Sequence, residues 1–303
     1  MTHAPSPGAC TRIARMAVNV HDIGRAAAFY GQALGFKPLG APRPATPERA
    51  ALLGGPYETL MMALGDTRLE LSRFLAPSTP YPADSRANDL WFQHFAITCH
   101  DIEALARRVV SLGGQPITRS GPQQLPPASG SVTAYKFRDP DGHPLELLVP
   151  AHTPPGDPAH PPDSRPAHTV AIDHTALSVG DGRRAGVFYE KALGLTPGAE
   201  QTNTGPKQEH LDDLPEVQVR VATLFTALPG PHLELLGYER PRGRRQALAA
   251  TDIAATRIVF ETTDLAALER RLTAHRHAPT RQVADAALGQ DTDGHWLLIE
   301  RVL

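Results

Sequence analysis

One carboxylate, Glu146, stands where an ionised group is costly. It follows a tight "DPDGHP" turn and lies inside the apolar strand pattern "LELL". Burying an ionised side chain there is unfavourable unless a cation or hydrogen-bond donors face it. A near-copy of the stretch, "DTDGHWLLIE" at 291–300, has Leu298 in the matching place. Glu146 is therefore expected to face a partner. Leu298, in the matching place of the second stretch, is apolar and requires no such partner.

A histidine, His94, stands in another apolar strand pattern, "WFQHFAI". Strand alternation places it on one face with Phe92 and Ala96. An imidazole in such a place can be a packed core residue or a metal ligand. His94 alone does not distinguish these two roles, so the elements around it have to be considered.

The sequence contains an internal duplication. "NVHDIGRAAAFYGQALGF" at 19–36 recurs as "SVGDGRRAGVFYEKALGL" at 178–195, and "TRLEL" around Glu70 recurs as "PHLELL" around Glu234. The spacing between copies drifts by a few residues, as expected when loops are inserted into a repeated frame.

Each half divides again into two similar units. The first begins with a strand at Met16 to Val20, and Asp22 is placed to cap a helix that ends at Gly35. Three further strands complete it. The second unit repeats the plan, with a strand at 91–98, a cap at Asp101, a helix at 102–112 and strands that end at Glu146. The third and fourth units begin near 173 and 256. The sequence thus predicts four βαβββ units, numbered here modules 1 to 4.

These modules predict the domain boundaries. Residues 1–12 are expected to be a tail, 13–150 a first domain with modules 1 and 2, and 168–303 a second domain with modules 3 and 4. Between the domains, 151–167 contains six prolines in "AHTPPGDPAHPPDSRPA". That composition is typical of a semi-extended linker.

Composition excludes several classes of function. The formal net charge is −2, and the basic cluster "ERPRGRR" is short and lacks aromatic residues, so no nucleic-acid partner is expected. No apolar run approaches a membrane span, and the N-terminus lacks a signal-peptide pattern. The two cysteines have no ligand spacing. A cytoplasmic protein that acts on a small molecule is expected.

The four modules, the "V-x-D…FY…LG" openings and the "DPDG-x-x-x-E" ending resemble the vicinal oxygen chelate superfamily, which includes glyoxalase I, bleomycin-resistance proteins and extradiol dioxygenases. The resemblance covers nearly the whole chain. It implies an α+β fold in which paired modules form two curled mixed sheets. The concave face of each sheet would hold a metal, and the helices would lie outside.

The resemblance also implies which residues are ligands, because each module can supply one from its first strand and one from its last. The aligned residues are, for modules 1 to 4 in turn, Arg15 and Glu70, His94 and Glu146, His174 and Glu234, and Arg257 and Leu298. Glu300 lies two residues beyond Leu298. If module 2 pairs with 3 and module 1 with 4, one site has two histidines and two glutamates. The other has two arginines, which cannot ligate a metal because they remain protonated.

We therefore expect one divalent metal per chain, held by His94, Glu146, His174 and Glu234. Arg15 and Arg257 would occupy a lost site, held by ion pairs such as those of Arg15 or Arg257 with Glu70 or Glu300. Two imidazoles and two carboxylates suit Ni, Co, Mn, Fe(II) or Zn, and the set does not choose among them. Because four modules already complete both sheet pairs, a monomer or a homodimer is expected.

A set of this kind resembles metal-dependent glyoxalase I. The resemblance implies a substrate with adjacent oxygens, isomerisation or lyase chemistry through an enediolate, and Glu146 or Glu234 as the proton shuttle. Three alternatives stay open: an extradiol ring-cleavage dioxygenase, a bleomycin-resistance type of binding protein without catalysis, and thiol transfer to an epoxide. Metal analysis and oxygen consumption separate these classes.

Further side chains are candidates for substrate contacts. His210 lies in the "QEHLDD" segment, and His232 precedes Glu234 by two residues on the same strand face. Tyr238 and Arg240 follow on that strand. The histidines of the two "DGH" turns, His143 and His295, are expected to be solvated.

Overall fold

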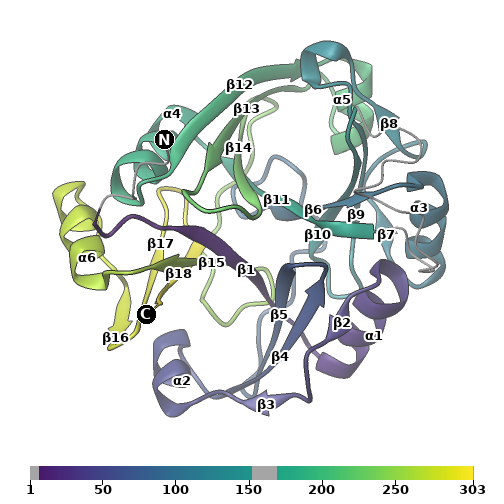
Figure 1. Ribbon diagram of the computed structural model, residues 1–303. Coiled ribbons are helices and arrows are strands. Elements are labelled where there is room, and N and C mark those ends of the chain that lie inside the picture. The colour runs from purple at the N-terminus through teal and green to yellow at the C-terminus, as the bar shows by residue number, and fades with distance from the viewer. Residues whose placement is uncertain (1–6, 152–168, 303) are drawn as a thin grey trace.

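The computed structural model describes residues 7–151 and 169–302. These fold into two nine-stranded sheets with parallel and antiparallel pairs, and most of the helices lie outside them (Figure 1). The α+β class with two mixed sheets is thereby confirmed. The predicted linker lies outside the described residues except for Ala151. Residues 9–11 of the predicted tail are buried, and Arg12 begins the first strand, so the described part of that tail belongs to the fold.

The first sheet combines modules 2 and 3, in the order β12-β13-β14-β11-β6-β10-β9-β7, with β8 also paired to β9. Its strands are β6 (Gln93–Cys99), β7 (Gln115–Pro116), β8 (Gln123–Gln124), β9 (Thr133–Arg138), β10 (Pro144–Val149), β11 (Thr169–Val179), β12 (Thr196–Thr204), β13 (Gln218–Phe225) and β14 (His232–Arg240).

The second sheet combines modules 1 and 4, in the order β16-β17-β18-β15-β1-β5-β4-β2, with β3 also paired to β4. Its strands are β1 (Arg12–Asn19), β2 (Lys37–Pro38), β3 (Arg43–Pro44), β4 (Tyr57–Leu64), β5 (Thr67–Phe74), β15 (Arg257–Thr262), β16 (Arg281–Val283), β17 (Ala286–Gln290) and β18 (Trp296–Arg301). The predicted pairing of modules is therefore confirmed, and each sheet draws on both halves of the sequence.

Four helices begin in the same way. In each, an aspartate accepts a hydrogen bond from the backbone N–H three residues later: Asp22, Asp101, Asp181 and Asp264. The helices are α1 (Ile23–Leu34), α2 (Pro47–Leu53), α3 (Ile102–Ser111), α4 (Gly182–Val187), α5 (Pro206–Asp212) and α6 (Leu265–Ala274), and one π-helical turn at Phe188–Ala192 extends α4. Gly35 ends α1 with a φ of 76°, a left-handed conformation that favours glycine.

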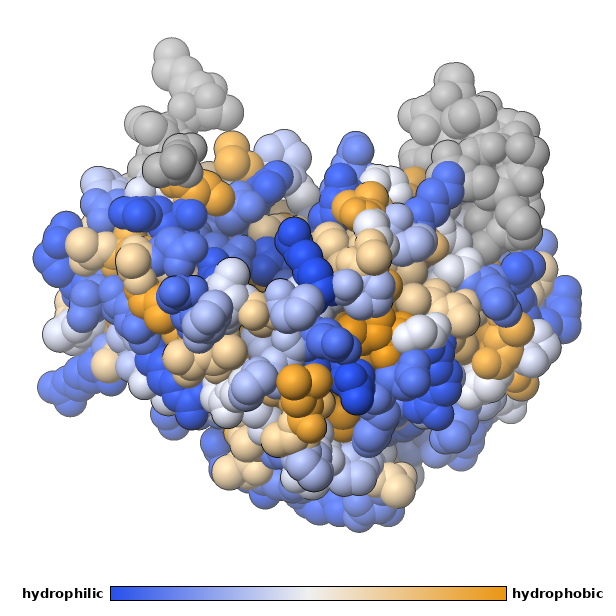
Figure 2. Space-filling view, turned by 90° about the horizontal axis from the view of Figure 1, so that it is seen from below, coloured by the Kyte–Doolittle hydropathy of each residue, from blue (hydrophilic) through white to orange (hydrophobic). Residues whose placement is uncertain are grey.

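Helices α2 and α5 pack on the concave faces of the sheets, whereas α1, α3, α4 and α6 bury their apolar faces against the outer faces. A single cluster of buried apolar side chains runs through these contacts and includes Met16, Phe95, Leu177 and Phe260, one from the first strand of each module. The face seen in Figure 2 is mostly hydrophilic, with apolar residues scattered over it. No helix in the described part of the chain is long and apolar enough to cross a membrane.

The "FY" and "DGH" motifs meet in a buried polar network. The Tyr30 hydroxyl donates to Asp139 at 2.8 Å, and His143 lies 2.9 Å from the same carboxylate. The other ring nitrogen of His143 lies 3.0 Å from the carbonyl oxygen of Ile253, in module 4. We call these residues the Tyr–Asp–His network.

A second copy of the network joins modules 3 and 4. Tyr189 donates to Asp291 at 3.0 Å, and His295 Nε2 lies 3.0 Å from the Ser178 carbonyl oxygen. The prediction that His143 and His295 are solvated is therefore wrong. Both are buried, because each "DGH" turn folds its histidine inward against a carbonyl oxygen of another module.

The network implies a pH-dependent contribution to stability. Burial lowers the pKa of His143, but the Asp139 carboxylate outweighs burial and raises that pKa above its ordinary value of about 6.5. A raised folded pKa means that the contribution is complete below about pH 6.5 and is lost as the pH rises through the folded pKa. His143→Gln should therefore lower the free energy of unfolding by on the order of 3 kcal/mol near pH 6, and by less at higher pH.

Urea unfolding of wild type and variant at several pH values measures this difference. His275→Gln, at an exposed position on the end of α6, is the matched control. A deficit for His143→Gln that does not change with pH would contradict the assignment.

Candidate metal centre

The strand register positions four side chains at the middle of the first sheet. In module 2, Glu146 on β10 pairs with Ala96, two residues after His94 on β6. In module 3, Glu234 on β14 pairs with Ala176, two residues after His174 on β11. Because side chains alternate along a strand, each histidine and its glutamate lie diagonally on one face.

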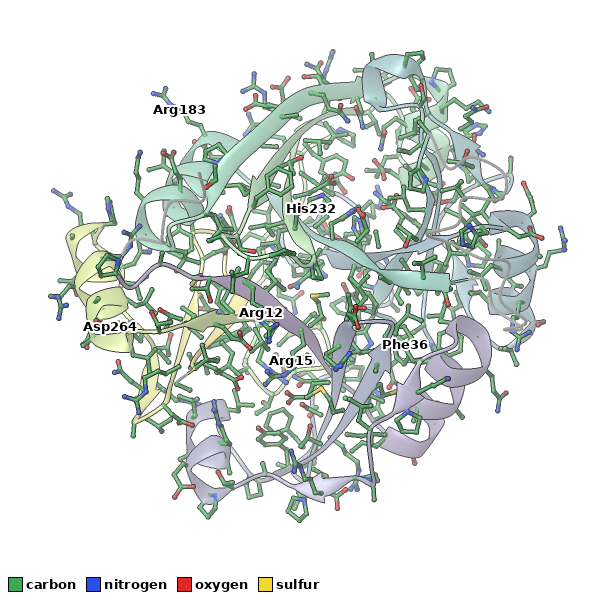
Figure 3. All side chains as sticks on the ribbon, viewed as in Figure 1. Arg12, Arg15, Phe36, Arg183, His232 and Asp264 are labelled. Atoms are coloured by element: carbon green, nitrogen blue, oxygen red, sulfur yellow. The ribbon has the colours of Figure 1, made fainter. Side chains whose placement is uncertain are left out.

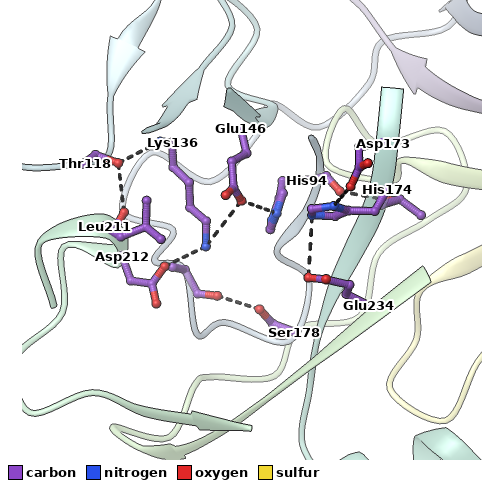
Figure 4. A network of polar contacts seen from close by, with 12 residues as sticks. His94, Thr118, Lys136, Glu146, Asp173, His174, Ser178, Leu211, Asp212 and Glu234 are labelled. Carbon is purple, nitrogen blue, oxygen red and sulfur yellow. Dashed lines mark hydrogen bonds and ion pairs between the residues drawn. The ribbon is translucent and has the colours of Figure 1, made fainter. Parts of the chain in front are cut away.

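The two histidines then meet across the central pair of strands. β6 and β11 run antiparallel, with His94 opposite Ala176 and His174 opposite Ala96. The ring centroids lie 5.8 Å apart. His94, Glu146 and His174 offer ligand atoms within 4.8 Å of one another. Glu234 lies beside this group, with its Oε2 3.6 Å from His174 Nε2 (Figure 4).

Three imidazole nitrogens in this group are buried without a hydrogen bond from the described residues: both nitrogens of His94, and Nε2 of His174. His94 Nε2 lies 2.8 Å from Glu146 Oε2, but the pair does not have the geometry of a hydrogen bond. Buried polar atoms are rarely left in this way, so each such atom calls for an explanation. Imidazole nitrogens beside two carboxylates in a buried space are of the types that could hold a divalent metal ion.

Asp173 orients His174. Its Oδ2 lies 2.9 Å from His174 Nδ1, which leaves Nε2 directed toward Glu234. A carboxylate behind a histidine in this way fixes the ring and its tautomer, and is common around metal-binding histidines.

The His94–Glu146 pair and the His174–Glu234 pair differ in the charge of their histidine. Burial lowers the pKa of His94, which favours the neutral imidazole that a metal requires. Burial also acts to lower the pKa of His174, but Glu234 and Asp173 outweigh it and raise that pKa to about 9. Glu234 has a pKa of about 2, because attraction to His174 and His232 exceeds the effect of burial. Both glutamates are carboxylates at neutral pH, since Lys136 likewise lowers the pKa of Glu146 despite burial.

Lys136 is the cation beside Glu146. It lies on β9 directly opposite Glu146, and its Nζ is 4.0 Å from Glu146 Oε2. The same Nζ donates to Asp212 Oδ1 at 2.7 Å. The other oxygen of Asp212 accepts hydrogen bonds from Gln208 and from the Tyr238 hydroxyl. We call Lys136, Asp212, Gln208 and Tyr238 the Lys136 network.

The donors open into a cavity of about 220 Å³. Besides them, its walls carry apolar residues from β13 and α5 and several amides. His232 lines it directly opposite His174, with ring centroids 5.1 Å apart (Figure 3). Tyr238 also lines it, but its hydroxyl is bound to Asp212.

Two predicted substrate residues do not line this cavity. His210 lies on α5, where its carbonyl oxygen accepts from the Arg119 backbone. Arg240 is exposed at the end of β14 and donates to Gln218 at 2.7 Å. The "QEHLDD" segment does reach the cavity, but through Gln208 and Leu211, which lie with Asp212 on the buried face of the helix.

Comparison with known proteins assigns the family. The model of the Glyoxalase/Bleomycin resistance protein/Dioxygenase superfamily matches residues 12–147 and 171–299. The chain belongs to this superfamily. Both matches fall on the duplicated halves, so the resemblance inferred from the modules is confirmed.

The curated relatives include lactoylglutathione lyase GLX1 from Arabidopsis thaliana, 31% identical over 185 residues, which are 61% of this chain and 55% of the relative. A putative lactoylglutathione lyase from Brassica oleracea var. gemmifera is 30% identical over the same shares. The matched stretch thus spans about half the length of these relatives.

Solved structures share the fold. Glyoxalase I from Zea mays is 20% identical with a TM-score of 0.62, and the match covers 96% of this chain and 92% of that one. A putative dioxygenase from Bacillus subtilis is 12% identical with a TM-score of 0.59, covering 97% and 86%.

The other sheet of this superfamily fold holds arginines in the equivalent positions. Glu70 pairs with Ala17, two residues after Arg15, and Leu298 pairs with Val259, two residues after Arg257. The register therefore confirms the alignment of all four modules. It also shows that Leu298 occupies the place that Glu146 has in module 2.

Arg15 fills the position that a ligand histidine has in module 2. Its Nε donates to Glu70 at 2.7 Å, and its two terminal nitrogens donate to Glu300 at 2.8 and 2.9 Å. The predicted ion pairs are thus confirmed for Arg15. Arg257, the other arginine named for these pairs, instead donates to Asn19 and Ser72 and makes no ion pair within the described part of the chain.

We expect Arg15→Ala to destabilise the protein without changing its metal content. Removing Arg15 leaves the buried Glu70 carboxylate without its main partner, which typically costs about 3–5 kcal/mol. Urea unfolding and elemental analysis of the same samples measure both quantities. Loss of metal in this variant would mean that the metal lies in the sheet of modules 1 and 4, and would contradict the assignment to modules 2 and 3.

Lys136→Met should also destabilise the protein, because it leaves Asp212 buried with two hydrogen bonds and no cation. We expect a loss of roughly 3 kcal/mol. The double variant Lys136→Met/Asp212→Asn should recover part of that loss, since the unpaired charge is gone. Equal losses in the single and double variants would show that the pair is not coupled.

Proposed function

We propose that the chain is a metal-dependent enzyme with glyoxalase-type activity and one active site. The observation that carries the proposal is the convergence of His94, Glu146 and His174 in a buried cavity, with Glu234 beside them and the imidazole nitrogens left without hydrogen bonds. A binding protein that used the cleft without a metal would leave these nitrogens unexplained.

The donor set fits one divalent ion held by His94, Glu146, His174 and Glu234. When bound, such an ion polarises oxygen atoms of the substrate and makes a neighbouring C–H group more acidic. The identity of the metal stays open among Ni, Co, Mn, Fe(II) and Zn, because nitrogen and carboxylate ligands suit each of them.

The two glutamates are held differently, and we assign them different roles. Glu146 is fixed between His94 and Lys136, and its side chain is 8% exposed. Glu234 is 21% exposed at the cavity, and its ion-pair partners among residues 7–151 and 169–302 are imidazoles. Glu234 is therefore the group that removes a proton from one substrate carbon and returns it to the next. Glu146 stays in place.

The substrate class follows from this chemistry and from the names of the relatives. When one proton moves between adjacent carbons and a second moves between their oxygens, a hydroxyl and a carbonyl group exchange places, with no net gain or loss of atoms or electrons. Applied to the adduct of glutathione and methylglyoxal, it yields lactoylglutathione, the compound in the names of the curated relatives. We propose a thiol adduct of a 2-oxoaldehyde as substrate.

Metal content tests the site. His94→Ala and His174→Ala should each lose stoichiometric divalent metal, because each removes one of four ligands. Arg15→Met is the matched control, since it changes the equivalent position of module 1 and should keep the metal. Elemental analysis of the purified proteins measures this. Unchanged metal in both histidine variants would refute the assignment.

Activity tests the roles of the glutamates. Wild type loaded with each candidate metal should form the thioester lactoylglutathione from glutathione and methylglyoxal. Glu234→Gln should lower kcat by at least about 100-fold, the usual worth of general acid–base catalysis, with KM little changed. Oxygen uptake with catechols is measured in parallel. Oxygen uptake without thioester formation would favour the dioxygenase instead.

Cytoplasmic location and a monomeric or homodimeric state stay predictions.

A further inference from the structure

The second sheet encloses a larger cavity than the proposed active site. It lies on the concave face formed by modules 1 and 4 and has a volume of about 380 Å³, against about 220 Å³ for the first. Arg15, Glu70, Leu298 and Glu300 form its floor, and the segment from Arg43 through α2 forms one wall. Figure 3 shows Arg15 in this part of the molecule. The proposed function gives this cavity no role.

The cavity lining carries more positive than negative charge. It includes three guanidinium groups, from Arg15, Arg43 and Arg49, and two carboxylates, from Glu70 and Glu300. Arg15 takes part in hydrogen bonds to both carboxylates. The lining therefore has one unit of positive charge in excess.

Arg257 adds a further positive charge beneath the floor. It is fully buried, and its hydrogen-bond partners in the described residues are neutral: Asn19 Oδ1 at 2.7 Å, Ser72 Oγ at 3.1 Å and the Ala250 carbonyl oxygen at 3.3 Å. A buried guanidinium without a carboxylate bound to it is rare, because its desolvation is not offset. Its field extends toward Glu70 and the cavity.

Donors at the cavity remain available. Arg43 is exposed at the rim and makes no hydrogen bond or ion pair within residues 7–151 and 169–302. Arg49 donates through Nη2 to Asp285 Oδ2 at 3.2 Å, whereas its Nη1, 3.2 Å from Glu300 Oε1, lacks hydrogen-bond geometry and remains available. The buried Thr59 hydroxyl, on β4 in the same lining, also has no partner among the described residues. These donors come from different elements that border one space.

We propose that this second cavity is a binding site for a small-molecule oxyanion, a carboxylate or a phosphate, held by Arg43 and Arg49 with Thr59. The planar guanidinium fork matches both groups, and charge-assisted hydrogen bonds of this kind are the strong ones. With Arg257 beneath the floor and Asp285 paired to Arg49 both counted, one unit of excess positive charge remains around the cavity and is complementary to such a ligand. The proposed site in modules 2 and 3 binds a cation between carboxylates, whereas the cavity of modules 1 and 4 binds an anion between arginines.

Titration calorimetry with inorganic phosphate and with malonate tests the proposal on the metal-loaded protein at low salt. Wild type should bind at least one probe, and the probe that binds tells a phosphate site from a carboxylate site. Arg43→Glu and Arg49→Gln should each weaken binding about tenfold, the effect of losing one charge-assisted hydrogen bond. Arg43 is exposed, so its variant is not expected to unfold.

Two controls separate this site from other sources of binding. His94→Ala should leave affinity unchanged, which distinguishes the second cavity from an anion bound at the metal. Arg73→Gln removes an arginine from β5 that does not line the cavity and should also have no effect. The proposal is overturned if wild type binds neither probe, if His94→Ala removes binding, or if Arg73→Gln weakens it as much as the Arg43 and Arg49 variants do.

Discussion

The whole arrangement depends on the parallel pairing of the first and last strand of each module. In module 2, for example, Glu146 of the last strand pairs with Ala96, which follows His94 of the first strand by two residues. His94 and Glu146 are therefore diagonal neighbours on one face, and the same register holds in the other three modules. The first strands of two modules then pair antiparallel, β6 with β11 and β1 with β15. Each sheet thereby brings two diagonal pairs to one point, whatever residues occupy them.

The same frame holds opposite charges in the two sheets. In the first, neutral or titratable nitrogens and two carboxylates leave a need for an external cation. In the second, the Arg15 guanidinium lies between Glu70 and Glu300 and supplies the cation from the chain itself. Arginine in place of histidine, together with Leu298 in place of a glutamate and with Glu300 two residues further on, gives an ion-pair cluster where the first sheet has the proposed metal site. The apolar Leu298 is tolerated there because no cation has to be ligated.

Periodicity and duplication were enough to predict the four modules, because these follow from local patterns repeated along the chain. The alignment of the four positions came from the family resemblance, and the pairing of modules came from that resemblance and from the way the histidines and glutamates sort into one site. The partners of the site were harder to predict. Lys136 is a polar residue in the apolar pattern "AYKF", and this was a signal, but its contact with Asp212 joins two modules through space. The "QEHLDD" segment pointed to His210 as a substrate contact, whereas the buried face of α5 carries Gln208, Leu211 and Asp212, because only the phase of the helix decides which side chains are buried.

The Tyr–Asp–His networks link modules within each half of the sequence, whereas the sheets link modules across the halves. The two halves are consequently interleaved, as in an exchanged dimer enclosed within one chain. During synthesis the first half emerges with β1 and β6 still lacking their antiparallel neighbours. Such open edges can pair with those of another nascent chain. Correct folding is thus a kinetic competition, in which tethering of the second half to the first favours the intramolecular product.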